Sequence, residues 1–95
     1  MKLLFHPLAR KEFEISANWY KERSIKVEKR FVESVFETID FIANNPKVVQ
    51  KIQREKRAAR VTGFPFSILY IVDSDSVFII SVFHHSRNPK IWKNR

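Results

Sequence analysis

Two runs of apolar residues separated by a short polar turn constrain the fold more than any other feature of this sequence. The runs are residues 68–72 (ILYIV) and 77–83 (VFIISVF), and DSDS at 73–76 lies between them. Branched and aromatic residues favour strands, and a short turn rich in Asp and Ser joins antiparallel neighbours. Because nearly every position of both runs is apolar, we expect two central strands that are covered on both faces.

The first half of the chain predicts a short strand and two helices. Residues 2–6 (KLLFH) have the pattern of the strand. Pro7 suits the first turn of a helix, which the apolar spacing carries to about residues 22–24. Ser24 is suited to cap a second helix. That helix should end at Asn44-Asn45-Pro46, because the residue before proline avoids the helical conformation.

A further strand is expected over residues 56–62, before a bend at Gly63-Phe64-Pro65. The predicted order is β-α-α-β-β-β. The fold class is therefore α+β, with a helical hairpin packed on a small, mainly antiparallel twisted sheet. We find no internal repeat, so residues 1–95 are expected to form one domain, with a basic C-terminal tail at 86–95.

Composition and apolar runs restrict the cellular compartment in which such a chain can be expected. It has 95 residues, 44% of them hydrophobic, and nine phenylalanines can supply much of a core. There is no cysteine, which excludes disulfides and cysteine-bound zinc and suits a reducing cytoplasm. The apolar run at residues 3–5 is too short for a signal peptide or a membrane span. We expect a cytoplasmic, soluble protein with no membrane partner.

The net charge of +8 is concentrated in two segments. Residues 51–60 (KIQREKRAAR) carry five Lys or Arg and one Glu, and residues 84–95 carry four Lys or Arg and no acid. Basic and acidic residues balance in the rest of the chain. A concentrated basic surface favours a polyanion or an acidic protein as partner, although a solvated charged face is the simpler interpretation of either segment alone.

Two adjacent histidines end the last predicted strand. Strand alternation places His84 on one face with residues 78, 80 and 82, and His85 on the other face with residues 79, 81 and 83. The two rings therefore cannot share one metal ion, and we expect neither a metal nor a cofactor. One histidine would suffice as a general acid or base; a capped core or a solvated ring is the alternative.

Basic residues beside the histidines offer a surface for phosphate or for a protein. In an extended segment Arg54, Lys56 and Arg60 share a face, with Arg57 beside them, and such a row could stabilise charge on a phosphate. In the tail, Arg87, Lys90 and Arg95 would grip phosphates while Trp92 stacks on a base. The alternative for Trp92 is to fold back onto the helices as part of the core.

The ordered set of segments resembles the RelE/ParE superfamily of type II toxin–antitoxin systems, of the ParE-like, plasmid-stabilisation branch. The segments that carry the resemblance are FHPLARKEFEISANWY, RFVESVFETIDFIANNP and GFPFSILYIVDSDSVFIISVFHHSRNPKIWKNR. The resemblance implies a small toxin that arrests growth and is neutralised by a cognate antitoxin, in a possible hetero-oligomer. It also implies the fold already expected from the pattern.

Members of the superfamily have two activities, and this sequence can be compared with each. RelE-like members cut messenger RNA on the ribosome with basic residues that line the sheet. Their central arginine matches Ser67 here, a lysine pair matches Ala58 and Arg60, and a further arginine matches His85. The aromatic residue of the tail falls near Ile91 or Trp92. The set is therefore incomplete.

ParE-like members instead poison DNA gyrase, which needs a binding surface and no catalytic set. Arg87 occupies the H-x-x-R position of that branch, so gyrase inhibition is the first expectation. A ribosome-dependent endoribonuclease using His85 and Arg60 is the alternative, and a degenerate toxin that only binds its antitoxin is a third. The residues expected to bind the target are Arg54, Lys56, Arg57, Arg60, His84, His85, Arg87, Lys90, Trp92 and Arg95.

Overall fold

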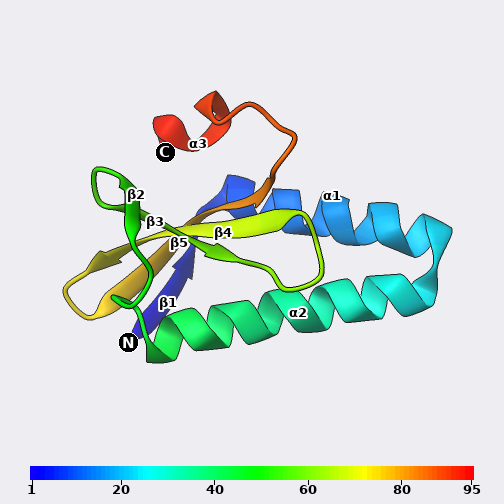
Figure 1. Cartoon of the computed structure of the whole chain (residues 1–95), viewed down its shortest axis with the longest axis horizontal. Helices are drawn as coiled ribbons and strands as arrows, with labels where there is room; N and C mark the ends of the chain where they lie inside the picture. Colours follow the sequence, from blue (N-terminus) through cyan, green and yellow to red (C-terminus); the bar gives the residue numbers. More distant parts are fainter.

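Five strands form one sheet, and two long helices lie along one of its faces (Figure 1). The computed structural model describes residues 1–95. The elements are β1 (Lys2–Phe5), α1 (Pro7–Arg23), α2 (Ile25–Asn44), β2 (Lys51–Gln53), β3 (Lys56–Arg60), β4 (Phe66–Asp73), β5 (Ser76–His84) and α3 (Lys90–Lys93). The strand order is β1-β5-β4-β3-β2, with β1 parallel to β5 and the other pairs antiparallel. The predicted α+β class and mainly antiparallel sheet are confirmed.

The ends of the two long helices follow local sequence signals. α1 begins at Pro7, and Nδ1 of His6 accepts a hydrogen bond from the Leu8 N–H at 3.0 Å. Oγ of Ser24 accepts from the Val27 N–H at 3.2 Å and caps α2, as predicted. α2 ends just before Asn45-Pro46, also as predicted. Charged residues interrupt every helix, and no helical segment has the length and apolarity that a bilayer crossing requires.

The main core lies between the helical hairpin and the sheet. Phe31 of α2 is fully buried, and its ring lies 5.0 Å from the rings of Tyr20 and Phe66. Tyr70 of β4 is also fully buried, and its hydroxyl donates to the Pro46 carbonyl at 3.0 Å. Full burial of one such aromatic side chain contributes about 2–3 kcal/mol. These contacts hold the helices across the centre of the sheet.

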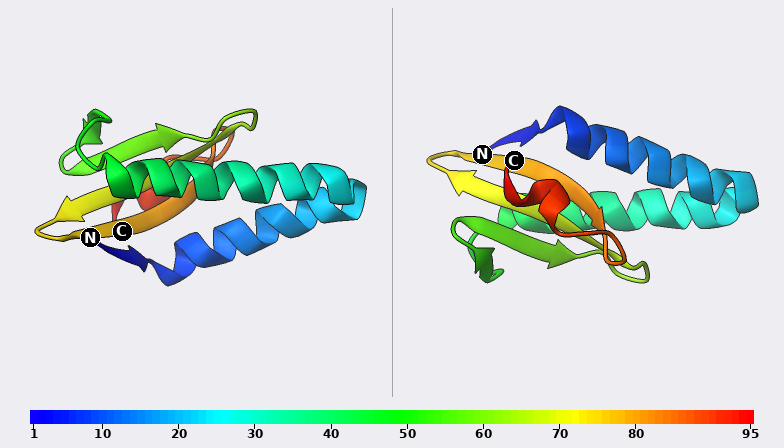
Figure 2. Two further views of the ribbon diagram at one scale, coloured as in Figure 1. Left: turned by 90° about the horizontal axis from the view of Figure 1, so that it is seen from below. Right: turned by 90° about the horizontal axis from the view of Figure 1, so that it is seen from above.

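A second, smaller core covers the opposite face of the sheet. Figure 2 shows α3, in red, over the face of the sheet opposite the two long helices. Trp92 of α3 is 6% exposed and packs with Leu69, Ile80 and Phe83. The Trp92 and Phe83 rings meet edge to face, with centroids 6.0 Å apart. The hairpin of β4 and β5 is thus covered on both faces, which confirms the prediction drawn from its continuous apolar pattern.

A β-bulge in β5 changes the predicted alternation of side chains. Leu69 pairs with Ser81 and Tyr70 pairs with Ile79, so Ile80 has no partner of its own on β4. The extra residue shifts the following side chains by one position. Residues 77, 79 and 82 consequently face the helices, whereas 78, 80 and 83 face α3. The predicted grouping of His84 with 78 and 80, and of His85 with 79, was therefore wrong.

Two elements have no counterpart in the predicted order. β2 has three residues, is largely exposed and pairs irregularly with β3, so it carries no apolar alternation. α3 is a single turn, too short for a helical period to be seen in the sequence. The strand expected over 56–62 ends at Arg60, and Gly63, with φ of +82°, forms the expected bend.

Candidate functional site

Three strand ends meet where the chain leaves β5. Arg60 at the end of β3 pairs with Ser67 near the start of β4, and Phe66 of β4 pairs with His84 at the end of β5. Antiparallel neighbours place the end of one strand beside the start of the next. The predicted site residues Arg60 and His85 consequently lie at one end of the sheet, with Ser67 of β4 between them.

Ser67 and His85 form a hydrogen-bonded pair at this end. The Oγ atom of Ser67 lies 2.8 Å from Nε2 of His85. Partial desolvation of the ring lowers the pKa of His85, and the positive charges of Arg60 and His84 lower it further, while a backbone hydrogen bond with Phe66 acts in the opposite direction. The imidazole is therefore neutral at pH 7 and can accept a proton.

His84 lies on the opposite side of the same strand end. Its ring packs edge to face against Phe66 with centroids 4.8 Å apart. Its Nδ1 accepts the Ser86 backbone N–H at 3.0 Å and lies 2.7 Å from Oγ of Ser86. Because Nδ1 accepts a backbone N–H, the proton of the neutral ring is on Nε2, which is a donor.

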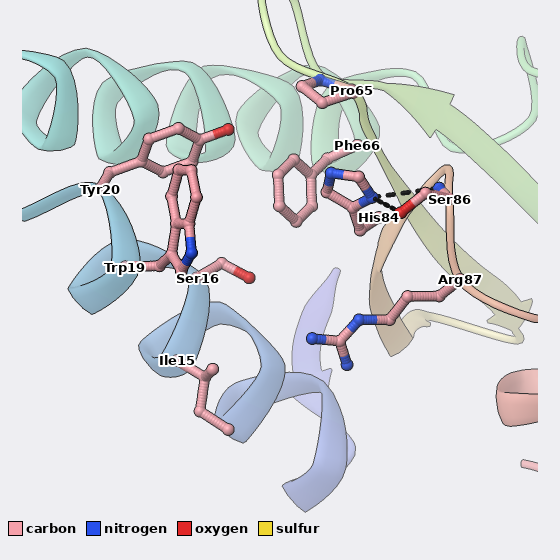
Figure 3. Close-up of a pocket in the computed structure, with 9 residues that line it drawn as sticks. All are labelled: Ile15, Ser16, Trp19, Tyr20, Pro65, Phe66, His84, Ser86 and Arg87. Atoms are coloured by element: carbon pink, nitrogen blue, oxygen red, sulfur yellow. Dashed lines mark hydrogen bonds between the residues drawn. The ribbon is translucent and has the colours of Figure 1, made fainter. Parts of the chain in front are cut away.

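A pocket of about 480 Å³ opens on the side of His84 (Figure 3). Its residues come from α1, from the start of β4 and from the turn after β5. They are Ile15, Ser16, Trp19, Tyr20, Pro65, Phe66, His84, Ser86 and Arg87. In Figure 3 the Arg87 guanidinium points across the pocket toward α1. The predicted site residues thus divide between two sides of the strand end: Arg60 and His85 on one, His84 and Arg87 on the other.

Three of the predicted target-binding residues are buried, which corrects the sequence-based list. Lys56 is 7% exposed, and its Nζ donates to the Lys93 carbonyl at 2.9 Å. Trp92 is 6% exposed and lies against the sheet, on the face away from the helices. The side chain of Arg95 is 8% exposed and pairs with Glu12. None of the three is available to a partner.

The basic row predicted on residues 54–60 is not formed. Arg54 lies in the turn between β2 and β3 with a φ of +51°, and the buried Lys56 faces α3. The guanidinium of Arg57 donates to the backbone carbonyls of Lys47 and Val49, so it ties the α2–β2 connection to the sheet. Of the row, only Arg60 lies beside His85. Lys90 is exposed at the start of α3.

Glu12, which was not among the predicted residues, fixes the tail to the rest of the molecule. Its Oε1 accepts from Oγ of Ser81 at 2.9 Å and from the Val82 N–H at 3.1 Å, next to the bulge. The same carboxylate takes two hydrogen bonds from the Arg95 guanidinium, at 2.9 and 3.1 Å. The Arg95 guanidinium also donates to the Ile80 carbonyl. One helix, one strand and the tail are thereby joined.

The pocket residues of α1 were also missed by the sequence reasoning. Trp19 is 51% exposed and Ile15 is 52% exposed, so both lie off the apolar face that the helical spacing predicted. Two bulky apolar residues one helical turn apart, outside such a face, are the signal that could have indicated them, because grouped exposed apolar side chains mark interaction sites. Their nearness to Arg87 depends on tertiary structure and could not be read from the chain.

Comparison with known families gives one match. A family model described as "ParE toxin of type II toxin-antitoxin system, parDE" matches residues 3–89. No curated protein matches the chain.

Several solved structures share the fold at low sequence identity. A chain of the chromosomal ParDE TA system from P. aeruginosa is 16% identical, with a TM-score of 0.74 over 88% of this chain and 95% of that one. The YoeB/ParE toxin from Agrobacterium tumefaciens is 17% identical, with a TM-score of 0.67 over 90% and 99%. A chain of the YoeB-YefM complex from Staphylococcus aureus is 18% identical, with a TM-score of 0.63 over 90% and 97%.

Proposed function

The chain belongs to the ParE toxin family of type II toxin–antitoxin systems, and we propose that it arrests growth by binding and inhibiting DNA gyrase. Gyrase poisoning is the activity that the resemblance assigns to the ParE-like branch. It requires an accessible surface rather than a catalytic set. Arg87 is exposed at the rim of the pocket, and its guanidinium makes no ion pair within the chain. A gyrase target would place the toxin in the cytoplasm.

The observation that carries this proposal is the position of the residues that a messenger-RNA nuclease would use. Ser67 stands where that branch has its central arginine, and Trp92 is buried under the sheet. Lys56, the remaining cation on the same face of β3 as Arg60, is also buried. Loss of one preorganised donor costs roughly 3–4 kcal/mol of transition-state stabilisation. A binding function needs no catalytic set, and Arg87 and Lys90 of its predicted residues stay exposed.

A second candidate function, cleavage of messenger RNA on the ribosome, is supported by the Ser67–His85 pair. A neutral imidazole hydrogen-bonded to a hydroxyl, beside the cation of Arg60, has the composition of a general base with a charge-stabilising partner. In this alternative His85 and Arg60 are the catalytic residues. The missing central cation makes it the weaker candidate.

We also propose a cognate antitoxin as the neutralising partner, in a hetero-oligomer. The solved relatives include the YoeB-YefM complex and a heterotetrameric YoeB-YefM toxin-antitoxin assembly from Staphylococcus aureus. On this chain a net charge of +8 supports a partner with an acidic segment. A toxin–antitoxin pair of this kind would also account for a role in plasmid stabilisation.

The test uses purified toxin freed of antitoxin in a gyrase supercoiling and cleavage assay, with a ribosome-bound message run in parallel. We expect inhibited supercoiling or trapped cleaved DNA, and an intact message. Cuts in the message within the ribosomal A site, with gyrase unaffected, would replace the proposal with the nuclease. Inactivity in both assays, with antitoxin binding retained, would indicate the degenerate toxin.

Arg87 provides the matched variant for this test. We expect Arg87→Ala to abolish growth arrest while the toxin still folds and binds its antitoxin, because the exposed guanidinium makes no ion pair within the chain. Lys93→Ala is the control, since it removes the same charge from the same tail on an exposed side chain outside the pocket. Growth arrest that persists in Arg87→Ala would exclude the tail from the mechanism.

A further inference from the structure

The pocket beside Arg87 combines an apolar body with a single cation. Phe66 of β4 and the preceding Pro65 line one side, and Ile15 and Trp19 of α1 line the other. Trp19 and Ile15 are about half exposed although both are large and apolar. Arg87 lies across the opening from them (Figure 3). Exposed apolar side chains grouped around a hollow mark an interaction site more reliably than scattered ones do.

All charged and polar groups around this pocket favour an anion. None of the lining residues is Asp or Glu, and Arg87 is the one full charge. The Nε2–H of His84 is a donor, because its Nδ1 accepts from Ser86. Burial raises the pKa of Tyr20, so its phenol keeps its proton at neutral pH. The hydroxyl of Ser16 adds a further donor, whereas the Ser86 hydroxyl donates to Nδ1 of His84. No negatively charged side chain lines the pocket to repel a bound carboxylate.

Trp19 is held in place before any partner arrives. The Arg23 guanidinium lies 3.6 Å from the centroid of the indole ring, and its Nη1 donates to the Trp19 carbonyl at 2.8 Å. The Tyr20 ring meets the indole edge to face, with centroids 5.2 Å apart. An exposed tryptophan fixed in one orientation loses little entropy on binding, which is the property of residues that dominate interface energies.

We infer that this pocket binds a peptide segment of the target protein in which a bulky apolar side chain lies next to a carboxylate. The apolar side chain would enter between α1 and Phe66, and the carboxylate would pair with Arg87. The inference rests on the proposed function, because it takes the target to be the protein that Arg87 contacts. It adds Trp19 and Ile15, from a different part of the chain, to that contact.

A peptide fits this pocket better than a nucleic acid does. Single-stranded nucleic acid requires several cations along its backbone and a free aromatic face for each stacked base. Here one face of the Trp19 ring is covered by Arg23, and only Arg87 supplies charge to the pocket. Arg60, the exposed cation beside His85, lies on the other side of the strand end.

The first experiment measures binding of short capped peptides to the full-length toxin by NMR. The probe GSFDEG has an apolar anchor and two carboxylates, whereas GSFNQG lacks the charge and GSADEG lacks the anchor. We expect GSFDEG to shift the Trp19 indole and His84 ring signals, and both controls to bind about tenfold more weakly. The inference is overturned if no peptide shifts these signals, or if a short oligothymidylate shifts them at lower concentration than GSFDEG does.

Two pairs of variants separate the pocket from general charge and apolar effects. Arg87→Gln should weaken GSFDEG binding about tenfold and Lys93→Gln less than about twofold, because Lys93 lies outside the pocket. Trp19→Ala should weaken it about tenfold and Phe41→Ala should not, although Phe41 is 44% exposed on α2. Ile15→Ala replaces Trp19→Ala if the latter alters thermal unfolding. Equal effects within either pair would contradict the assignment.

The second experiment measures binding of the same variants to purified gyrase. If wild-type toxin binds gyrase, Trp19→Ala should weaken that binding about tenfold while Phe41→Ala does not. Equal binding by all variants would overturn the assignment of the peptide to the target. If wild-type toxin does not bind gyrase at all, the proposed function fails, and the peptide measurement alone decides what the pocket binds.

Discussion

At the scale of single residues, Glu12 is the side chain on which most contacts at the end of the molecule converge. Its carboxylate accepts from Ser81, Val82 and Arg95 and is only 11% exposed. Removing one partner of a buried ion pair leaves the other charge uncompensated. We expect Glu12→Gln to lower the free energy of unfolding by roughly 3 kcal/mol, measured by urea denaturation.

The matched control for Glu12 lies on the same helix. Glu14 is exposed and makes no hydrogen bond or ion pair, so Glu14→Gln should change the free energy of unfolding by less than about 0.5 kcal/mol. Adding Arg95→Met to Glu12→Gln should restore part of the loss, because it removes the unpaired charge. If the double variant were no more stable than Glu12→Gln, the stabilisation by Glu12 would come from Ser81 and Val82 alone.

The lowered pKa of His85 predicts how the stability of the protein depends on pH. The pKa of His85 is lowered in the folded protein, so between that lowered value and the ordinary 6.5 the unfolded chain binds more protons than the folded one. The contribution of His85 to stability therefore falls as the pH drops through this window and is constant above it. In Arg60→Gln the repulsive charge is gone, and an NMR titration should give a higher pKa for His85. Arg54→Gln, at the opposite end of β3, should leave it unchanged.

At the scale of elements, Trp92 supplies the apolar contact between α3 and the sheet. Trp92 packs on Leu69, Ile80 and Phe83, and its indole N–H makes no hydrogen bond, so its contribution is apolar packing. We expect Trp92→Ala to cost about 3 kcal/mol in thermal unfolding and to increase binding of a hydrophobic dye, because the second core becomes exposed.

A substitution at Ile91 tests whether the stability lost in Trp92→Ala comes from lost packing on the sheet or from a weaker α3 helix. Ile91 precedes Trp92 in the same turn and is 37% exposed. Ile91→Ala should therefore change the free energy of unfolding by less than about 0.5 kcal/mol and leave dye binding unchanged. Comparable losses in both variants would mean that α3 is stabilised by its own helical turn rather than by the tryptophan.

At the scale of the whole molecule, the features that could be predicted are those set by neighbours in the chain. Ser24 and Pro46 fix helix ends through local backbone effects, and the hairpin of β4 and β5 follows from two apolar runs and a polar turn. The bulge at Ile80 and the pairing of Arg95 with Glu12, 83 residues away, have no local signal. They depend on which elements pack together. This is why Arg95 was expected at the surface, and why the sequence left Trp92 open between a base-stacking role and a place in the core.

The candidate site also includes residues that no local sequence pattern indicates. The sequence predicted Arg60, His85 and Arg87 as site residues because a basic or titratable residue at a strand end is visible along the chain. It did not indicate Trp19, because Trp19 is a candidate through its exposure beside Arg87, and exposure is a property of the folded molecule.

The parallel pairing of β1 with β5 has a consequence for how a cell can make this toxin. Lys2 lies beside Ser76, so the first strand has no partner until one of the last segments has been synthesised. Strand β5, the α3 side of the second core and Arg87 itself all belong to that late segment. A nascent chain that lacks β5 therefore carries its helices without the strand that joins β1 to β4, and it also lacks Arg87.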